Sequence, residues 1–137
     1  MFFEYKNQIR VIFVENKKLF SPAFNSKIIF NAKGINHLLY KGNRSRRDIE
    51  RIEINLKLLP RAVKLLSEAT FWQEESNYKT EDIFYKFWAF EAVVEERRIK
   101  VIVRQVGNGI KHFWSVIPAW RKDRFGIVNA RKKNLED

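Results

Sequence analysis

The stretch from residue 84 to residue 118 constrains the fold most, because it has the pattern of three consecutive antiparallel strands. The run 84–94 is almost entirely aromatic and aliphatic, and the charged residues 95–97 that follow are typical of a tight connection. Residues 98–105 alternate with the period of two that is typical of a strand. Residues 110–117 form the third expected strand, which ends at Pro118 because proline cannot continue a ladder.

The turn at residues 106–109 (VGNG) decides which side chains share a face with Lys100 and Arg104. Glycine and asparagine tolerate the positive φ angles that hairpin turns need. A two-residue turn places Phe113 and Ser115 on the face of Lys100 and Arg104, whereas a three-residue turn places His112 and Trp114 there. Both alternatives stay open, and either set of side chains could do chemistry.

The N-terminal part is expected to contribute two strands and a short helix. Residues 8–14 (QIRVIFV) alternate as a strand does, residues 19–26 are expected to be irregular, and residues 27–30 (KIIF) to form a second strand that pairs with the first. Asn31 is a suitable N-cap for a helix over residues 32–40, and Gly42 is a suitable left-handed residue after its end.

A long helix is expected to begin near Ser45. Its apolar residues repeat at spacings of three and four, which predicts a buried stripe of Ile49, Ile52, Leu56, Leu59, Val63 and Leu66. Pro60 lies inside this stripe, so we expect a kink, or a break at which a second helix opens. Residues 70–82 are expected to be a polar loop.

These elements predict an α+β fold in a single domain over residues 1–137, ending in a basic tail over residues 121–137. The N-terminal strands and two helices are expected to pack on one face of an antiparallel sheet, whose main part is the C-terminal three-stranded meander. The other face of the sheet is expected to be open to a ligand.

The charge of the chain points to the kind of partner. There are 27 Lys and Arg against 16 Asp and Glu, which gives a net charge of +11. On an aromatic-rich domain this predicts a polyanionic partner, most often nucleic acid. An acidic protein, such as an antitoxin or an immunity protein, would fit the same surface.

The absence of cysteine excludes disulfides, thiolate metal sites and a cysteine nucleophile, and it fits a reducing compartment. No apolar run approaches the ~20 residues that cross a bilayer. The N-terminus also lacks the pattern of a secretion signal. We therefore expect a cytoplasmic protein that does not use a membrane.

The residues that could carry chemistry form a cationic set. The sequence has no phosphate-binding glycine loop, no serine nucleophile elbow and no close pair of histidines, so no metal ion or other cofactor is expected. The candidate catalytic residues are His37, Lys100, Arg104, His112 and Ser115, and the candidate nucleic-acid contacts are Arg44, Arg46, Arg47, Arg98 and Lys111. Each also has a purely structural explanation, such as a half-buried helix residue for His37 or a solvated strand face for Lys100 and Arg104.

Such a set suits RNA cleavage, because the ribose 2′-OH is an internal nucleophile and the protein need not supply one. A histidine near neutrality can move the protons. Lysine and arginine can stabilise the negative charge of the transition state.

Four stretches match a known pattern in their order and spacing: residues 34–39 (GINHLL), 58–63 (LLPRAV), 98–104 (RIKVIVR) and 112–117 (HFWSVI). They resemble the barnase–EndoU–colicin–RelE group of metal-independent ribonucleases, in particular its phage-type members. The resemblance covers about residues 30–118, and residues 8–30 lie outside it. It implies two helices followed by a four-stranded antiparallel sheet, with His37, Lys100, Arg104 and Ser115 on the active face, whereas the place of His112 stays open.

The resemblance makes an RNA endonuclease the first hypothesis: a toxin or a mobile-element effector that leaves a cyclic phosphate. The second is a non-catalytic RNA- or DNA-binding domain that uses the same basic face. The third is a module that recognises an acidic protein. Cleavage of RNA that survives a chelator selects the first, and binding without cleavage selects the second.

Overall fold

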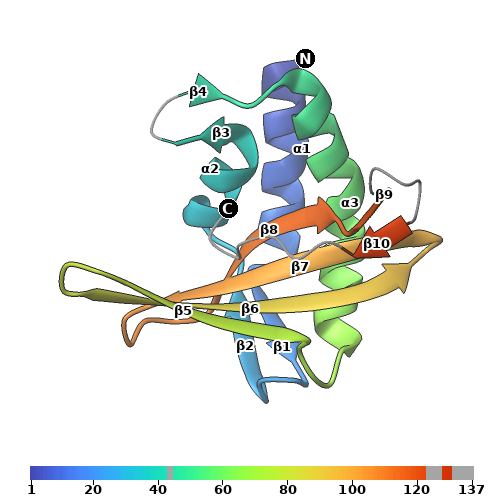
Figure 1. Ribbon diagram of the computed structural model, residues 1–137. Coiled ribbons are helices and arrows are strands. Elements are labelled where there is room, and N and C mark those ends of the chain that lie inside the picture. The colour runs from blue at the N-terminus through green and yellow to red at the C-terminus, as the bar shows by residue number, and fades with distance from the viewer. Residues whose placement is uncertain (43–44, 123–127, 131–137) are drawn as a thin grey trace.

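The computed structural model of the protein describes residues 1–42, 45–122 and 128–130 (Figure 1). The fold is α+β, with three helices packed on a six-stranded, mostly antiparallel sheet. The strand order is β1-β2-β8-β7-β6-β5. The bounds of these strands are β1 (Lys18–Ser21), β2 (Ser26–Ile29), β5 (Glu74–Thr80), β6 (Ile83–Val94), β7 (Arg97–Val106) and β8 (His112–Pro118).

Two short antiparallel pairs lie outside the main sheet. One pairs β3 (Tyr40–Lys41) with β4 (Ser45–Arg46), and the other pairs β9 (Trp120–Lys122) with β10 (Val128–Ala130). The candidate contact Arg44 and most of the basic tail fall outside the described residues.

The C-terminal meander is confirmed. Strands β6, β7 and β8 pair antiparallel in chain order, and the parallel pairing in the main sheet, between β2 and β8, lies outside the meander. Val94 pairs with Arg97, so Glu95 and Glu96 form a two-residue turn. Both have positive φ (48° and 68°), as a turn that follows the twist of the strands requires.

The prediction of a strand over residues 8–14 is wrong, because this segment lies within helix α1 (Phe2–Glu15). Its buried residues are Phe2, Ile9 and Phe13, and the partly buried Tyr5 and Ile12 complete a helical stripe. The alternation within 8–14 is local, whereas the spacing of three and four extends back to Phe2. β-Branched residues lower helix propensity only slightly, so burial of this stripe decides the structure.

The strand predicted at 27–30 is confirmed as β2, but its antiparallel partner is β1, within residues expected to be irregular. The short helix is confirmed as α2 (Ala32–Leu39), and the Asn31 side chain caps it by accepting a hydrogen bond from the backbone N–H of Lys33 at 3.1 Å. Gly42 has the predicted positive φ (66°), but it lies in the turn between β3 and β4, because Tyr40 already leaves the helix in an extended conformation.

The long helix is α3 (Ile49–Glu68), which begins four residues later than predicted because β4 occupies residues 45–46. It contains Pro60, so the predicted opening of a second helix is wrong. Pro60 is on the exposed side of the helix, where water can satisfy the carbonyl that proline leaves unpaired. The predicted stripe is otherwise correct: Ile52, Leu59 and Leu66 are fully buried, and Ile49 lies partly outside the core.

The predicted loop over residues 70–82 is also wrong in part, because residues 74–80 form the edge strand β5. This strand pairs with β6 along its whole length, from Glu74 opposite Ala89 to Thr80 opposite Ile83. Its sequence is polar because this edge strand is mostly exposed. A polar composition is also typical of loops, which is why the segment was predicted to be one.

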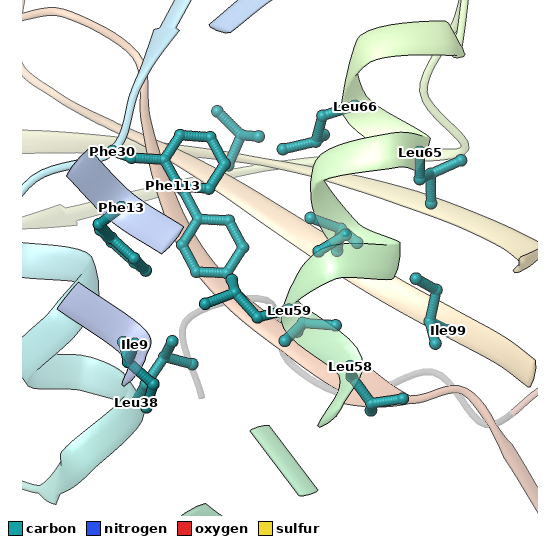
Figure 2. Close-up of a cluster of buried hydrophobic side chains, with 14 of the residues drawn as sticks. Ile9, Phe13, Phe30, Leu38, Leu58, Leu59, Leu65, Leu66, Ile99 and Phe113 are labelled. Atoms are coloured by element: carbon teal, nitrogen blue, oxygen red, sulfur yellow. The ribbon is translucent and has the colours of Figure 1, made fainter. Parts of the chain in front are cut away.

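The hydrophobic core lies between the helices and one face of the sheet. Figure 2 shows Phe13 of α1 and Leu59 of α3 near Phe113 of β8, with Ile9 and Leu58 further along the same two helices. The Phe113 ring stacks on Phe30 at 4.9 Å and meets Phe13 edge-on at 5.5 Å. Phe113 therefore packs β8 against α1 and against the residue that follows β2.

The opposite face of the sheet, called the far face below, carries Tyr85, Phe87, Ala89, Ile102 and Arg104. We predicted that this face would be open to a ligand, but the residues at its centre are buried. Ala89 and Ile102 are 0% and 1% exposed, and the polar residues Lys100 and Ser115 are 2% and 3% exposed.

Candidate functional site

A β-bulge at Trp114 decides which side chains share the far face. Arg104 pairs with His112, as a three-residue turn requires, but Ile102 pairs with Ser115, as a two-residue turn requires. The register changes between Val103 and Ile102, and Trp114 is the extra residue. Each alternative left open by the sequence therefore holds on one side of the bulge, and His112 and Ser115 both lie on the face of Lys100 and Arg104.

The extra residue, Trp114, stands at the centre of a cluster that joins α2 to the sheet. The His37 ring stacks on Trp114 at 3.9 Å, with the two planes 19° apart. The Arg104 guanidinium carbon lies 3.6 Å from the Trp114 ring centroid. Two groups this close to one ring would overlap on a single face of it, so His37 and Arg104 occupy opposite faces of the indole.

Helix α2 reaches Trp114 because Gly34 lets it approach β8 closely. A Cβ atom at Gly34 would lie 2.6 Å from the Phe113 carbonyl oxygen and 3.0 Å from the Phe13 ring. Only a residue without a side chain fits there. His37 follows one helical turn later, so the contact at Gly34 sets the distance between the imidazole and Trp114.

The C-terminal end of α2 is held by side chains from the following segments. Arg47 Nε donates to the carbonyl oxygen of His37 at 2.8 Å, and Asn55 Nδ2 donates to that of Leu38 at 2.9 Å. These bonds satisfy carbonyls that a helix end leaves unpaired. The candidate nucleic-acid contact Arg47 therefore holds the end of α2 that carries His37, and its burial lowers its pKa.

Arg104 is oriented by a hydrogen bond as well as by the indole. Its Nε donates to Nε2 of His112 at 3.0 Å. Burial, and then the charge of Arg104, lower the pKa of His112 to about 4, so the imidazole is neutral at physiological pH. Because Nε2 accepts this bond, we assign the ring proton to Nδ1.

The Arg104 guanidinium keeps its charge without a carboxylate partner. In the described part of the chain no Asp or Glu lies within 4.0 Å of it. It is half-buried, and burial lowers its pKa. A partly desolvated, oriented guanidinium attracts an anion more strongly than a solvated one does.

Lys100 and Ser115 lie on the same face but away from this cluster. Lys100 is four residues from Arg104 along β7, which is roughly 13 Å in a strand. Its Nζ lies 2.8 Å from Glu74 Oε1, an ion-pair distance, although the geometry misses that of a hydrogen bond. Lys100 is 2% exposed, so the structure places it in a buried ion pair rather than beside His37.

The other candidate nucleic-acid contacts that the structure describes are dispersed. The exposed Arg46 packs over the Phe2 ring at 3.9 Å. Arg98 pairs with Glu91 at 2.8 Å. Lys111 lies 5.1 Å from the Phe24 ring centroid, on the side of the sheet that packs against the helices. Each of these three side chains therefore has its own packing or ion-pair partner in the structure.

Three residues of the site and its surroundings were missed from the sequence: Trp114, Tyr85 and Glu74. Trp114 had a signal in the sequence, because a three-residue turn places it with His112 on the face of Arg104. Tyr85 and Glu74 had no such signal, because their roles depend on which strands are neighbours.

Comparison with protein-family models, curated proteins and solved structures finds no match to this chain. Among the residues that the structure describes, no group of three or more His, Cys, Asp or Glu side chains is placed to hold a metal ion. No helix of the described residues is long and apolar enough to span a membrane.

Proposed function

We propose that this protein is a metal-independent RNA endonuclease whose active site is the cluster of His37, Arg104 and His112 around Trp114. The observation that carries the proposal is the environment of the Arg104 side chain. Its guanidinium is half-buried, stacked on Trp114 and fixed by His112, and no carboxylate within ion-pair distance in the described part of the chain neutralises it. The net charge of +11 supports a polyanionic substrate.

Arg104 would bind the phosphate that is attacked. Its Nε is occupied by His112, which leaves both terminal nitrogens for phosphate oxygens in the two-pronged arrangement that arginine favours. The same charge would stabilise the phosphorane as negative charge builds up on it.

His37 would move the proton. It takes the proton from the ribose 2′-OH, the 2′-oxygen forms a bond to phosphorus, and the bond from phosphorus to the 5′-oxygen breaks. The proton then passes from the imidazole to the 5′-oxygen. The products are a 2′,3′-cyclic phosphate and a 5′-hydroxyl, and this step consumes no water and needs no metal ion.

His112 would act through Arg104 rather than on the substrate. Its Nε2 is already bonded, and its pKa of about 4 makes it a poor proton donor at neutral pH. It is therefore a positioning residue in this mechanism.

A non-catalytic RNA-binding domain is the second candidate function. It is favoured by the same engagement of His112, which leaves one histidine in the cluster for both proton transfers. Binding of RNA without cleavage, with an affinity that falls steeply as salt rises, selects this function.

The experiment that tests the proposal uses a single-stranded RNA in excess chelator. We expect cleavage, with products that carry a 2′,3′-cyclic phosphate. A matched oligonucleotide with one 2′-deoxyribose should resist cleavage at that position only. Cleavage after the deoxyribose, or products with 5′-phosphates, would exclude attack by the 2′-OH.

A further inference from the structure

A row of neighbouring aromatic rings continues from Arg104 across the far face of the sheet. The Arg104 guanidinium carbon lies 5.8 Å from the centroid of the Tyr85 ring in β6. The Tyr85 ring lies 5.9 Å from the Tyr78 ring in β5, with the planes 39° apart. Tyr78 and Tyr85 are direct cross-strand partners, and Phe87, two residues from Tyr85, is the partner of Arg104. Side chains at such positions share one face of a sheet.

The row becomes more exposed with distance from Trp114. Trp114, Arg104 and Tyr85 are half-buried, whereas Tyr78 on the edge strand is 46% exposed. The hairpin of β5 and β6 extends beyond the body of the sheet (Figure 1). An aromatic side chain in this position leaves much of its surface accessible to a partner.

We propose that Tyr78 and Tyr85 form a stacking platform for the bases of single-stranded RNA and guide the strand to Arg104. This inference rests on the proposed function for the identity of the nucleic acid. The row contains aromatic faces for bases and, at its inner end, a cation for phosphate. That combination of aromatic and cationic groups is how proteins bind single strands independently of sequence.

The arrangement favours a single strand over a duplex. Paired bases stack on one another inside a double helix, so their faces are not accessible to a tyrosine ring. Unpaired bases can stack on Tyr78 and Tyr85 while the backbone passes beside Arg104. Stacking on tyrosine is sequence-tolerant because every base has a π-face.

The opposite face of the same hairpin offers a rival path. A hollow of about 720 Å³ is lined there by residues that include Asn77, Phe84, Lys86 and Gln105, and Tyr85 also borders it. Phe84 is 57% exposed and lies next to Tyr85 in the chain, but its side chain points to the other face. The variant Phe84→Ala is therefore a matched control, because it removes an exposed aromatic ring from the same hairpin.

The test measures binding of a 2′-O-methyl RNA oligonucleotide, which the proposed reaction cannot cleave, by fluorescence anisotropy. We expect Tyr78→Ala to raise Kd about 5- to 150-fold, the range for loss of one stacked base. Tyr78→Phe should bind as the wild type does, because stacking does not need the hydroxyl. Phe84→Ala should leave Kd unchanged, and a duplex of the same sequence should not respond to Tyr78→Ala.

Wild-type affinity in Tyr78→Ala would overturn the platform, as would an equal loss in Phe84→Ala. Circular dichroism of each variant shows whether the fold is retained, and Tyr78→Phe distinguishes loss of the ring from loss of structure. The result of this binding test does not depend on the result of the cleavage assay. Binding that depends on Tyr78 in a protein that cleaves nothing would leave the platform in place and remove the endonuclease.

Discussion

Arg104 Nε donates a hydrogen bond to Nε2 of His112 at 3.0 Å, between two residues that are cross-strand partners in β7 and β8. Their pairing follows the register of a three-residue turn, and the bulge at Trp114 changes the register only between Val103 and Ile102. The hydrogen bond ties the charge state of the histidine to the orientation of the arginine. A protonated His112 could no longer accept the bond, and it would add a second positive charge beside the guanidinium.

The first prediction is a loss of stability in mild acid that depends on His112. The pKa of His112 is lowered from 6.5 to about 4 by burial and by Arg104. Between these values the unfolded chain binds a proton that the folded chain does not, so falling pH favours unfolding. The loss should develop from pH 6.5 down to about pH 4 and reach at most about 3 kcal/mol, since solvent screens part of the Arg104 charge.

Urea denaturation of the wild type and of His112→Gln at several pH values measures this effect. Glutamine can still accept from Arg104 but does not titrate. The carboxylates titrate in both proteins, so the difference between the two unfolding free energies isolates His112. Parallel stability curves from pH 7 to pH 4 would show that His112 does not have the lowered pKa.

The second prediction concerns Gly34→Ala. In an exposed helix interior this change stabilises a protein by up to about 1 kcal/mol. Here the added Cβ would lie 2.6 Å from the Phe113 carbonyl oxygen, so we expect the sign to reverse, with a destabilisation of about 1–3 kcal/mol. Denaturation measures the stability, and RNA cleavage should also fall because His37 moves with α2.

Asn36→Ala is the matched control for Gly34→Ala, because residue 36 is exposed on the same helix. Its effect on stability should stay within about 0.5 kcal/mol. A Gly34→Ala protein that is more stable than the wild type would mean that α2 does not pack against β8 as closely as described.

The third prediction is an asymmetry in the ion pair of Lys100 and Glu74. The Lys100 side chain is 2% exposed, whereas that of Glu74 is 27% exposed. Removing the carboxylate with Glu74→Gln leaves a buried ammonium without its partner, which costs roughly 3–5 kcal/mol. Lys100→Met should cost less, because the carboxylate that remains can reach water.

Thermal or urea denaturation of the two variants gives the order of stabilities. Equal losses, or a greater loss in Lys100→Met, would contradict the burial of Lys100. The sequence predicts a catalytic role for Lys100, whereas the structure places it away from Trp114, so folded Lys100→Met should cleave RNA at a rate close to that of the wild type. A loss of cleavage beyond about 100-fold without a loss of structure would restore the catalytic role.

The meander, helix α2 and the stripe of α3 could be predicted because each is specified by residues near one another in the chain. Strand period, N-cap and helical spacing are local patterns. Helix α1 could have been predicted from the spacing of Phe2, Ile9 and Phe13, but the alternation within residues 8–14 is the stronger pattern over a short window. Edge strand β5 could not be predicted from the sequence, because a polar strand has the amino-acid composition of a loop.

The candidate site was predicted in its residue types but not in its arrangement. His37, Arg104 and His112 were named from the sequence, and the structure brings all three to Trp114. Trp114 was not chosen as a candidate, although a three-residue turn would place it with His112 on the far face, because its central position depends on His37 packing from α2. Lys100 was grouped with Arg104 because both lie on one face of β7, and strand period carries no information about distance along the strand or about the ion pair with Glu74.

The most direct test of the account is the rate of RNA cleavage by Arg104→Ala in the presence of excess chelator. Arg98→Ala is the matched control, because Arg98 lies on the same strand but is exposed and paired with Glu91. With RNA saturating, we predict that Arg104→Ala is slower than the wild type by about 10²–10³-fold and that Arg98→Ala is not. Cleavage by Arg104→Ala at the wild-type rate, or equal losses in both variants, would contradict the assignment of the active site to Arg104.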